Sequence, residues 1–377
     1  MLRITLFDDE MREDLFPLSL SRSCADFRWG ILTIREKWEK VLNSAVHIKT
    51  VDYLQPLYGN ATHPVEVNSR LLPNNDFIKQ LSNLCAGDAI YKGEVLLARN
   101  GTNESKRVEY TGEVVLLSNL WDIFQFNARE IESDFQILTS GRSSQKLSST
   151  NQVFGKHPVF LEEGAKVECA IFNTTDGPIY LAKDSEVMEG AMIRGPFALG
   201  EHSQVKMGAR IYSGSSFGPH CKVGGEVSNS VIFGYSNKGH EGFLGNSVLG
   251  EWCNLGADTN NSNLKNNYDE VRLWNYRKKS FVKTGLQFCG LIMGDHSKSG
   301  INTMFNTGTV VGFSSNIFGA GFPRNFIPSF SWGGAAGIEL YTLPKALQTA
   351  QRVMARRGVE LTEVHKNIFK VIENIEK

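Results

Sequence analysis

The chain has 377 residues, 41% of them hydrophobic, and its 40 basic side chains balance 40 acidic ones. With roughly 100–200 residues per domain, about two domains are expected, and the ordinary apolar content excludes intrinsic disorder. The zero formal charge gives no electrostatic basis for nucleic acid or an anionic membrane as main partner, and no run approaches the roughly 18–20 apolar residues of a membrane span.

The cysteines and the first residues favour a cytoplasmic protein. Six cysteines lie far apart without a C-x-x-C pair, which favours reduced thiols over a disulfide framework or a zinc knuckle. The segment MLRITLFDDE turns acidic after six residues, unlike a secretory signal.

Residues 1–138 have the pattern of an α/β module. RITLF predicts a first strand, and EVLLA and EVVLLS, at 94–98 and 113–118, predict two more. GILTIREKWEKVL predicts an amphipathic helix with Ile34, Trp38, Val41 and Leu42 on one stripe. The polar residues 139–152 are expected to be a linker.

A six-residue period dominates the region 153–334. The aliphatic or aromatic positions that carry it are Leu181, Val187, Ile193, Leu199, Val205, Ile211, Phe217 and Val223, then Phe243, Leu249 and Leu255, and later Phe305, Val311 and Ile317. A helical period of 3.6 cannot hold this spacing, and glycines or other small residues often follow the apolar residue. The period predicts a parallel β-helix whose apolar residues point into the shaft.

The period stops after Trp332-Gly333-Gly334, and residues 335–377 predict two terminal helices. TLPKALQTAQRVMARRG has Thr342 as a cap, Pro344 in its first turn and Gly358 as its stop, and TEVHKNIFKVIENIEK follows.

Two motifs within the β-helix carry a family resemblance. GPFA at 195–198 and GHEGFLGNSVLGEWCNLGADT at 239–259 resemble the acetyltransferase centre of the bifunctional N-acetylglucosamine-1-phosphate uridyltransferase/glucosamine-1-phosphate acetyltransferase family. The resemblance implies a nucleotidyltransferase-like α/β domain, a left-handed parallel β-helix of hexapeptide repeats, C-terminal helices and a homotrimer with sites between subunits. It also implies acetyl-CoA as co-substrate and a role in UDP-N-acetylglucosamine synthesis for the bacterial envelope.

The resemblance also implies site residues. His240 matches the catalytic histidine, Phe243 stands where the family has a sugar-contacting tyrosine, and Asn254 matches an asparagine near the acetyl group. The family's next Asn-Tyr pair is either Asn263 by count or Asn267-Tyr268 by motif, because NSNLKNNYD carries an insertion. Arg210 and Lys238 are the nearest candidates for phosphate contacts. Ala257 and Ile301 take positions close to coenzyme A.

The N-terminal half departs from the family. Sugar nucleotidyltransferases cradle the triphosphate with backbone N–H groups of a glycine-rich loop after the first strand. Here that strand is followed by DDEMRED, where five carboxylates surround Arg12, the one candidate nucleotide contact. Unpaired carboxylates about 4 Å from a phosphate charge repel it by roughly 4 kcal/mol at an effective dielectric of 20. We expect a degenerate nucleotidyltransferase domain, with Mg²⁺ required only if it is active.

The chemistry expected of His240 is general base catalysis. An amine reaches neutral solution largely as its ammonium and must lose a proton to attack a thioester, and imidazole, with an unperturbed pKa near 6.5, can accept it. A backbone N–H on a neighbouring coil, or the Asn254 amide, could donate to the oxyanion.

Three alternatives remain open from the sequence. The first is an active sugar-phosphate uridyltransferase with an atypical phosphate loop, and the second a non-catalytic trimeric scaffold that binds a sugar or nucleotide. The third is a metal site. His202 and His220 are 18 residues apart and should stack one coil apart, but zinc needs a third ligand, and no metal is expected.

Overall fold

The N-terminal α/β module is built on one mixed sheet in the computed structural model, which describes residues 2–376. Its strand order is β2-β1-β3-β5-β4-β6. The strands are β1 Thr5–Phe7, β2 His47–Lys49, β3 Val65–Asn68, β4 Asp88–Lys92, β5 Val95–Asn100 and β6 Lys106–Glu109. The helices are α1 Ile34–Leu42, α2 Asn75–Ser82, α3 Asp122–Gln125 and α4 Asn127–Thr139, with short 3₁₀ turns η1 Glu10–Leu15, η2 Cys24–Asp26 and η3 Gln55–Leu57.

Most of the predicted elements of this module form, and one does not. RITLF forms β1, EVLLA forms β5, and the amphipathic stripe forms α1, which begins at Thr33 with a reciprocal capping box to Glu36. The strand predicted at 113–118 is wrong. This segment makes a single bridge, Leu71 to Leu116, because it runs beside residues 70–72, which are not a strand themselves.

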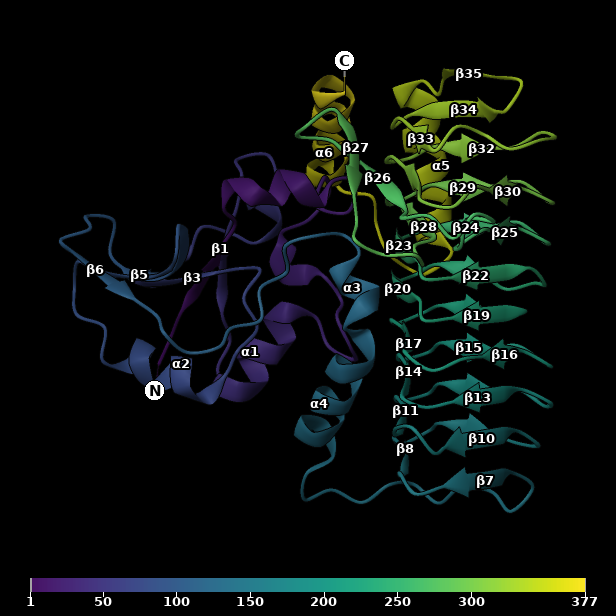
Figure 1. Ribbon diagram of the computed structural model, residues 1–377, viewed down its shortest axis with the longest axis horizontal. Helices are drawn as coiled ribbons and strands as arrows, with labels where there is room; N and C mark the ends of the chain where they lie inside the picture. The colour runs from purple at the N-terminus through teal and green to yellow at the C-terminus, as the bar shows by residue number, and fades with distance from the viewer. Residues whose placement is uncertain (1, 377) are drawn as a thin grey trace.

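The second half is a parallel β-helix of three faces, and each coil passes from face III to face I to face II (Figure 1). Face I comprises β8 Val159–Leu161, β11 Ile179–Leu181, β14 Phe197–Leu199, β17 Ser215–Phe217, β20 Val231–Gly234, β23 Val248–Glu251, β28 Leu291–Met293, β31 Thr309–Val311 and β33 Phe326–Ile327. Face II comprises β9 Lys166–Val167, β12 Glu186–Val187, β15 Gln204–Val205, β18 Lys222–Val223, β21 Asn237–Lys238, β24 Asn254–Leu255, β29 Lys298–Ser299, β32 Asn316–Ile317, β34 Ser331–Gly334 and β35 Gly337–Leu340. Face III comprises β7 Gln152–Gly155, β10 Ile171–Thr174, β13 Met192–Arg194, β16 Arg210–Ile211, β19 Glu226–Ser228 and β22 Phe243–Gly245, and is continued by the pair β25 Asn260–Asn261 and β30 Met304–Phe305.

The six-residue period marks the interior of this shaft, as predicted. All of its positions from Leu181 to Val223 are at most 2% exposed and form one core cluster with Leu249, Leu255 and the later members. Phe243 is the exception. It lies on the outside of face III, and Leu244 points inward, because Val227 pairs with Leu244 in the register of β19 and β22. The coil there is shorter than 18 residues, so the strict six-residue count fails.

An insertion interrupts the shaft between β25 and β28. Leu264 and Phe288 form an antiparallel bridge where it leaves and re-enters the shaft. Between them lies a hairpin of β26 Arg272–Asn275 and β27 Ser280–Lys283. The hairpin reaches the N-terminal module, where Asn275 donates to Asp14 (2.9 Å) and Arg277 pairs with the same carboxylate (3.4 Å).

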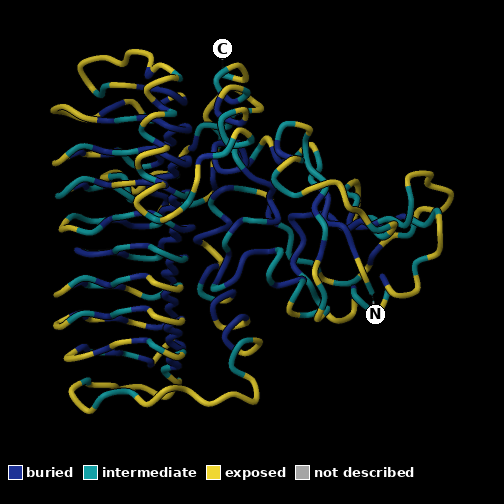
Figure 2. The backbone as a smooth tube through the Cα atoms, turned by 180° about the vertical axis from the view of Figure 1, so that it is seen from behind, coloured by how far each residue is buried: buried dark blue, intermediate teal, exposed yellow. Residues whose placement is uncertain are grey.

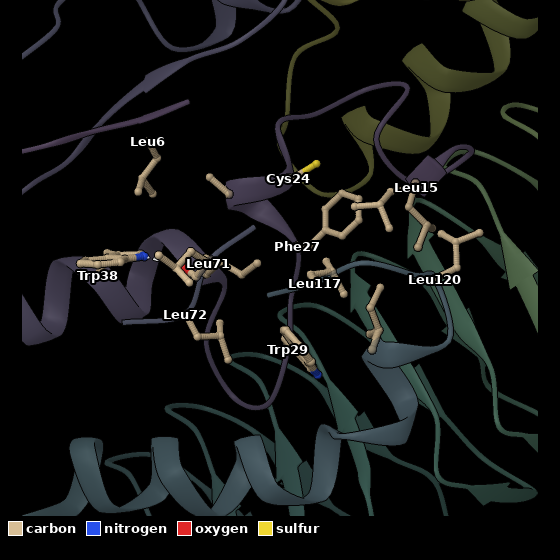
Figure 3. Close-up of a cluster of buried hydrophobic side chains, with 14 of the residues drawn as sticks. Leu6, Leu15, Cys24, Phe27, Trp29, Trp38, Leu71, Leu72, Leu117 and Leu120 are labelled. Atoms are coloured by element: carbon tan, nitrogen blue, oxygen red, sulfur yellow. Dashed lines mark hydrogen bonds between the residues drawn. The ribbon is translucent and has the colours of Figure 1, made fainter. Parts of the chain in front are cut away.

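The module and the shaft share one hydrophobic core along face I. Phe27 of the module packs against Phe233 of β20 with ring centroids 5.4 Å apart, and both belong to a cluster that extends into β28 and β31. Figure 3 shows the module's side of this core. The backbone turned toward the module is buried, whereas the outermost turns of the shaft are exposed (Figure 2).

The chain ends in two helices, α5 Leu343–Ala355 and α6 Glu363–Ile375, as predicted. Thr342 is the N-terminal cap residue of α5, but its side chain makes no capping hydrogen bond. Both helices pack with Trp252, Phe313 and Phe330 on the corner between faces I and II. The module therefore covers face I, the terminal helices cover the corner between faces I and II, and the insertion leaves the shaft where face III meets face I. The corner between faces II and III is exposed at Met207, Ile301 and Phe318.

Candidate functional site

His240 lies on the corner between faces II and III, on an open edge of the shaft. Its side chain is exposed, and its imidazole makes no hydrogen bond or ion pair with any of residues 2–376. The next two coils place Ala257 and Ile301 above it: Glu241 accepts from the peptide N–H of Asp258 (2.9 Å), and Ala257 accepts from that of Asn302 (2.9 Å). The candidate base and the two candidate coenzyme A contacts therefore follow one another along one corner.

Lys238 is the unexpected member of this region because it occupies a core position of the shaft. Its register partner on the preceding coil is Val223, and Leu255 takes the same position on the following coil. The side chain is 1% exposed, and its ammonium donates to the carbonyls of Gly224 and His240, both at 2.9 Å. Burial lowers the Lys238 pKa to about 8. A phosphate cannot reach this ammonium from outside, so the geometry argues against the phosphate contact expected from the sequence.

Face III presents Arg210 and Phe243 beside the His240 corner. The Arg210 guanidinium contacts Glu241 at 2.8 Å and Glu226 at 3.8 Å, and its hydrogen bond to Glu241 raises its pKa. Phe243 is half-exposed, and its backbone N–H donates to the side chain of Asn260 (2.8 Å). Arg210 is therefore near the site but is already paired with two carboxylates.

The candidate asparagines do not converge with His240 in a single chain. Asn254 is exposed on face II, 3.5 Å from the Asn237 amide. Asn263 lies at the far end of face III and donates to Asn246 (2.7 Å). Asn267 accepts from the backbone of Asp269 within the insertion, and Tyr268 is 66% exposed there. These residues are therefore divided among face II, the end of face III and the insertion.

The acidic loop after β1 is held by contacts within the module. Asp9 receives a two-pronged ion pair from Arg70, with nitrogen–oxygen distances of 2.9 and 2.6 Å. Asp8 accepts from the hydroxyls of Ser23, Thr50 and Ser69. Arg12 is 4% exposed and donates to the Ser19 carbonyl, and its guanidinium is 3.8 Å from Asp8. The carboxylates and Arg12 are thus engaged with the protein itself.

A buried ion network that no sequence pattern indicated joins the two halves. Arg22 pairs with Asp295 and with Glu251 (3.0 Å), and Asp295 also accepts from Ser21 (2.6 Å). Arg22 and Asp295 are almost fully buried, and all three ions line a cleft of about 400 Å³ that α6 borders. Arg22 and Asp295 are 273 positions apart, so no local pattern could have paired them.

The predicted stack of His202 and His220 is confirmed, with ring centroids 5.0 Å apart. It continues through Tyr235 and Trp252 to His296, so it is a structural ladder of rings on the corner between faces I and II. Within residues 2–376, no group of three histidine, cysteine or acidic residues is arranged to hold a metal ion.

Comparison with known proteins agrees with both halves of the fold. Residues 4–143 match the family model described as sugar nucleotidyl transferase. A bifunctional sugar-1-phosphate nucleotidylyltransferase/acetyltransferase from Sulfurisphaera tokodaii is 28% identical over 215 residues, which are 56% of this chain and 47% of that protein. The chain is related to these bifunctional proteins. The resemblance expected from the sequence is therefore confirmed.

Other similarities are shorter or more distant. The bifunctional protein GlmU of Methanococcus aeolicus is 34% identical over 92 residues, 24% of this chain and 22% of that protein. The chain thus spans less than half the length of the two relatives it matches. Among solved structures, the polySia specific acetyltransferase NeuO aligns at 14% identity with a TM-score of 0.30, covering 55% of this chain and 96% of that one. No helix within residues 2–376 has the length and apolar character needed to cross a membrane.

Proposed function

We propose that this protein is a transferase whose β-helix moves the acetyl group of acetyl-CoA to the amine of an amino-sugar phosphate, with glucosamine 1-phosphate as the first candidate. The observation that carries the proposal is the open corner where His240, Ala257 and Ile301 follow one another on successive coils. The relationship to bifunctional nucleotidylyltransferase/acetyltransferases supports it. We place the reaction in the cytoplasmic UDP-N-acetylglucosamine pathway.

The proposed reaction needs one base and one oxyanion donor. The free imidazole of His240 takes a proton from the substrate amine as its nitrogen attacks the thioester carbonyl. The peptide N–H of Ala257, one coil above, is our candidate donor to the oxyanion of the tetrahedral intermediate. Collapse of that intermediate breaks the carbon–sulfur bond and releases the coenzyme A thiolate, which takes up a proton. Asn254 remains a candidate substrate contact.

The experiment that tests this proposal is release of the coenzyme A thiol from acetyl-CoA with a panel of amino-sugar phosphates. We expect turnover that depends on a free amine, with none on the N-acetylated sugar. Absence of turnover on every amino sugar of the panel would favour the non-catalytic scaffold.

A second activity, uridyl transfer by the N-terminal module, is favoured by the match of residues 4–143. The contacts of the acidic loop weigh against it, because Arg12 is buried and bonded within the module. We therefore infer that the module is degenerate and needs no Mg²⁺. Pyrophosphate release from UTP and N-acetylglucosamine 1-phosphate, measured in the same preparation, would overturn that inference.

We further propose that the protein is a homotrimer whose subunits close the site. The His240 corner is open in a single chain, and large apolar residues lie exposed along the same corner: Met207 is 69% exposed, Ile301 71% and Phe318 40%. Burying such residues against a second copy would stabilise an assembly. Light scattering is expected to give about three times the 42.0 kDa chain mass, and a monomer mass at micromolar concentration would contradict the proposal.

Lys238→Met is expected to lower kcat roughly ten- to a hundredfold without loss of stability. The methionine retains an unbranched apolar side chain in the shaft but leaves the His240 carbonyl without its internal donor, and a small displacement of a reacting group has effects of this size. The lowered pKa of Lys238 means that the folded protein binds fewer protons than the unfolded chain between about pH 8 and 10.4. The free energy of unfolding of the wild type should therefore rise with pH over that window, and that of the variant should not.

The matched control is Lys298→Met, which removes another lysine whose pKa burial lowers to about 8 and which donates to the carbonyl of His296 (2.7 Å). It should leave kcat unchanged. A Lys238→Met variant with wild-type kcat would show that Lys238 does not position His240.

A further inference from the structure

A cleft of about 600 Å³ lies between the inserted hairpin and the last coils of the shaft. The hairpin contributes Arg272, Trp274 and Phe281, and the shaft contributes Arg324 and Phe326. Lys265, at the start of the insertion, completes the set of cations. This volume is within the range of about 300–1,000 Å³ that small-molecule sites occupy.

The charged groups that line this cleft all have the same sign. Arg272 and Arg324 are exposed, and their guanidinium groups make no hydrogen bond or ion pair with any of residues 2–376. Lys265 is partly engaged, since it donates to the Glu270 carbonyl (2.6 Å) and lies 3.8 Å from Asp269. No carboxylate is among the residues lining the cleft. Two unpaired guanidiniums with planar forks favour a phosphate as the group they bind.

The remaining wall is aromatic. Trp274 and Phe326 stack with ring centroids 4.4 Å apart, and Phe281 meets Trp274 edge-on at 5.3 Å. Phe281 is still 43% exposed, so aromatic surface remains available beside the arginines. An inorganic phosphate or a sugar phosphate would leave this surface in contact with water, and a neutral ring would leave both guanidiniums unpaired. A planar ring joined to phosphate uses both walls.

We propose that the cleft binds a nucleotide, with its base against the aromatic wall and its phosphates at Arg272 and Arg324. The residues that line the cleft belong to the insertion and the last coils of the shaft, and none of them belongs to the acidic loop or to the His240 corner, although the hairpin contacts that loop through Asn275 and Asp14. The proposal therefore does not depend on acetyl transfer or on an active nucleotidyltransferase module.

Calorimetric titration of the full chain with UDP and with ADP tests this proposal. At least one of them should bind the wild type, with uridine or adenosine and pyrophosphate each binding at least about tenfold more weakly. Arg272→Ala and Arg324→Ala should each weaken the nucleotide about tenfold or more, as expected for loss of a charge-assisted bond. Phe281→Ala should weaken the nucleotide but leave pyrophosphate binding unchanged.

The control is Arg352→Ala, which removes an exposed guanidinium of α5 that likewise has no partner within residues 2–376, and it should bind as the wild type does. Two results would overturn the proposal. One is no binding of either nucleotide at millimolar concentration. The other is equal nucleotide affinity in the wild type and both arginine variants, which would assign the binding to another part of the chain such as the module.

Discussion

His240→Ala is expected to lower kcat for acetyl transfer by about two to four decades and to leave KM for acetyl-CoA nearly unchanged. The side chain is exposed and makes no contact that holds the shaft together, so the variant should fold. What it loses is the proposed base, which acts only as the proton leaves the amine.

His202→Ala is the matched control, since it removes another exposed histidine from a different corner of the shaft. It should retain wild-type turnover. A well-folded His240→Ala protein that keeps at least half of the wild-type kcat would refute the role of His240. A variant whose activity falls only in proportion to a lowered melting temperature would instead indicate a structural histidine.

Arg22→Met is expected to lower the free energy of unfolding by about 3–5 kcal/mol, measured by urea titration, because it leaves a buried carboxylate without its counter-ion. Asp295 is 3% exposed, and its pKa is raised by burial even though Arg22 opposes that shift. Without Arg22 the charged form becomes still less favourable in the folded state. The stability difference should therefore be largest where Asp295 is charged in both proteins and should shrink as the pH falls and Asp295 becomes protonated.

Two comparisons separate this ion network from ordinary surface pairs. Arg107→Ala breaks an exposed pair with Glu94 (3.4 Å) and should change stability by less than about 1 kcal/mol. The double variant Arg22→Met/Asp295→Asn should recover part of the loss, because the unpaired charge is gone. A loss below about 1 kcal/mol in Arg22→Met alone would mean that water or neighbouring groups already solvate Asp295.

The architecture followed from a local regularity, and the site did not. Because every coil repeats the same inward position, the period from Leu181 to Val223 was enough to predict the β-helix. Where coils shorten, the period no longer says which residue is inside. Val223 and Lys238 are register partners 15 positions apart, so the six-residue period does not indicate that Lys238 is buried, and it wrongly predicts Phe243 as a core residue.

Contacts between segments far apart in the chain could not be predicted from the sequence, because they too lie outside the repeated pattern. The pairing of Arg22 with Asp295 depends on how the module docks on face I, which no periodicity encodes. His240, Ala257 and Ile301 lie on one corner of the shaft, and the roles that the motif predicts for them stay predictions. Asn254, Asn263 and Tyr268 lie on separate parts of the chain, so the motif match alone does not bring them to one substrate.

The bridge between Leu264 and Phe288 closes the insertion at the shaft, so the coils continue past it. Its two ends meet at one point of the shaft. The strand after the insertion, β28, pairs in parallel with β23 of the preceding coil, as neighbouring coils do elsewhere in the shaft. Changes at the exposed end of the hairpin, such as at Phe281, should leave the rise of the coils unchanged, whereas Val271 and Leu273 are buried in the core shared with the module. Diversity among relatives is best sought in this segment, where a change in ligand preference need not disturb the scaffold.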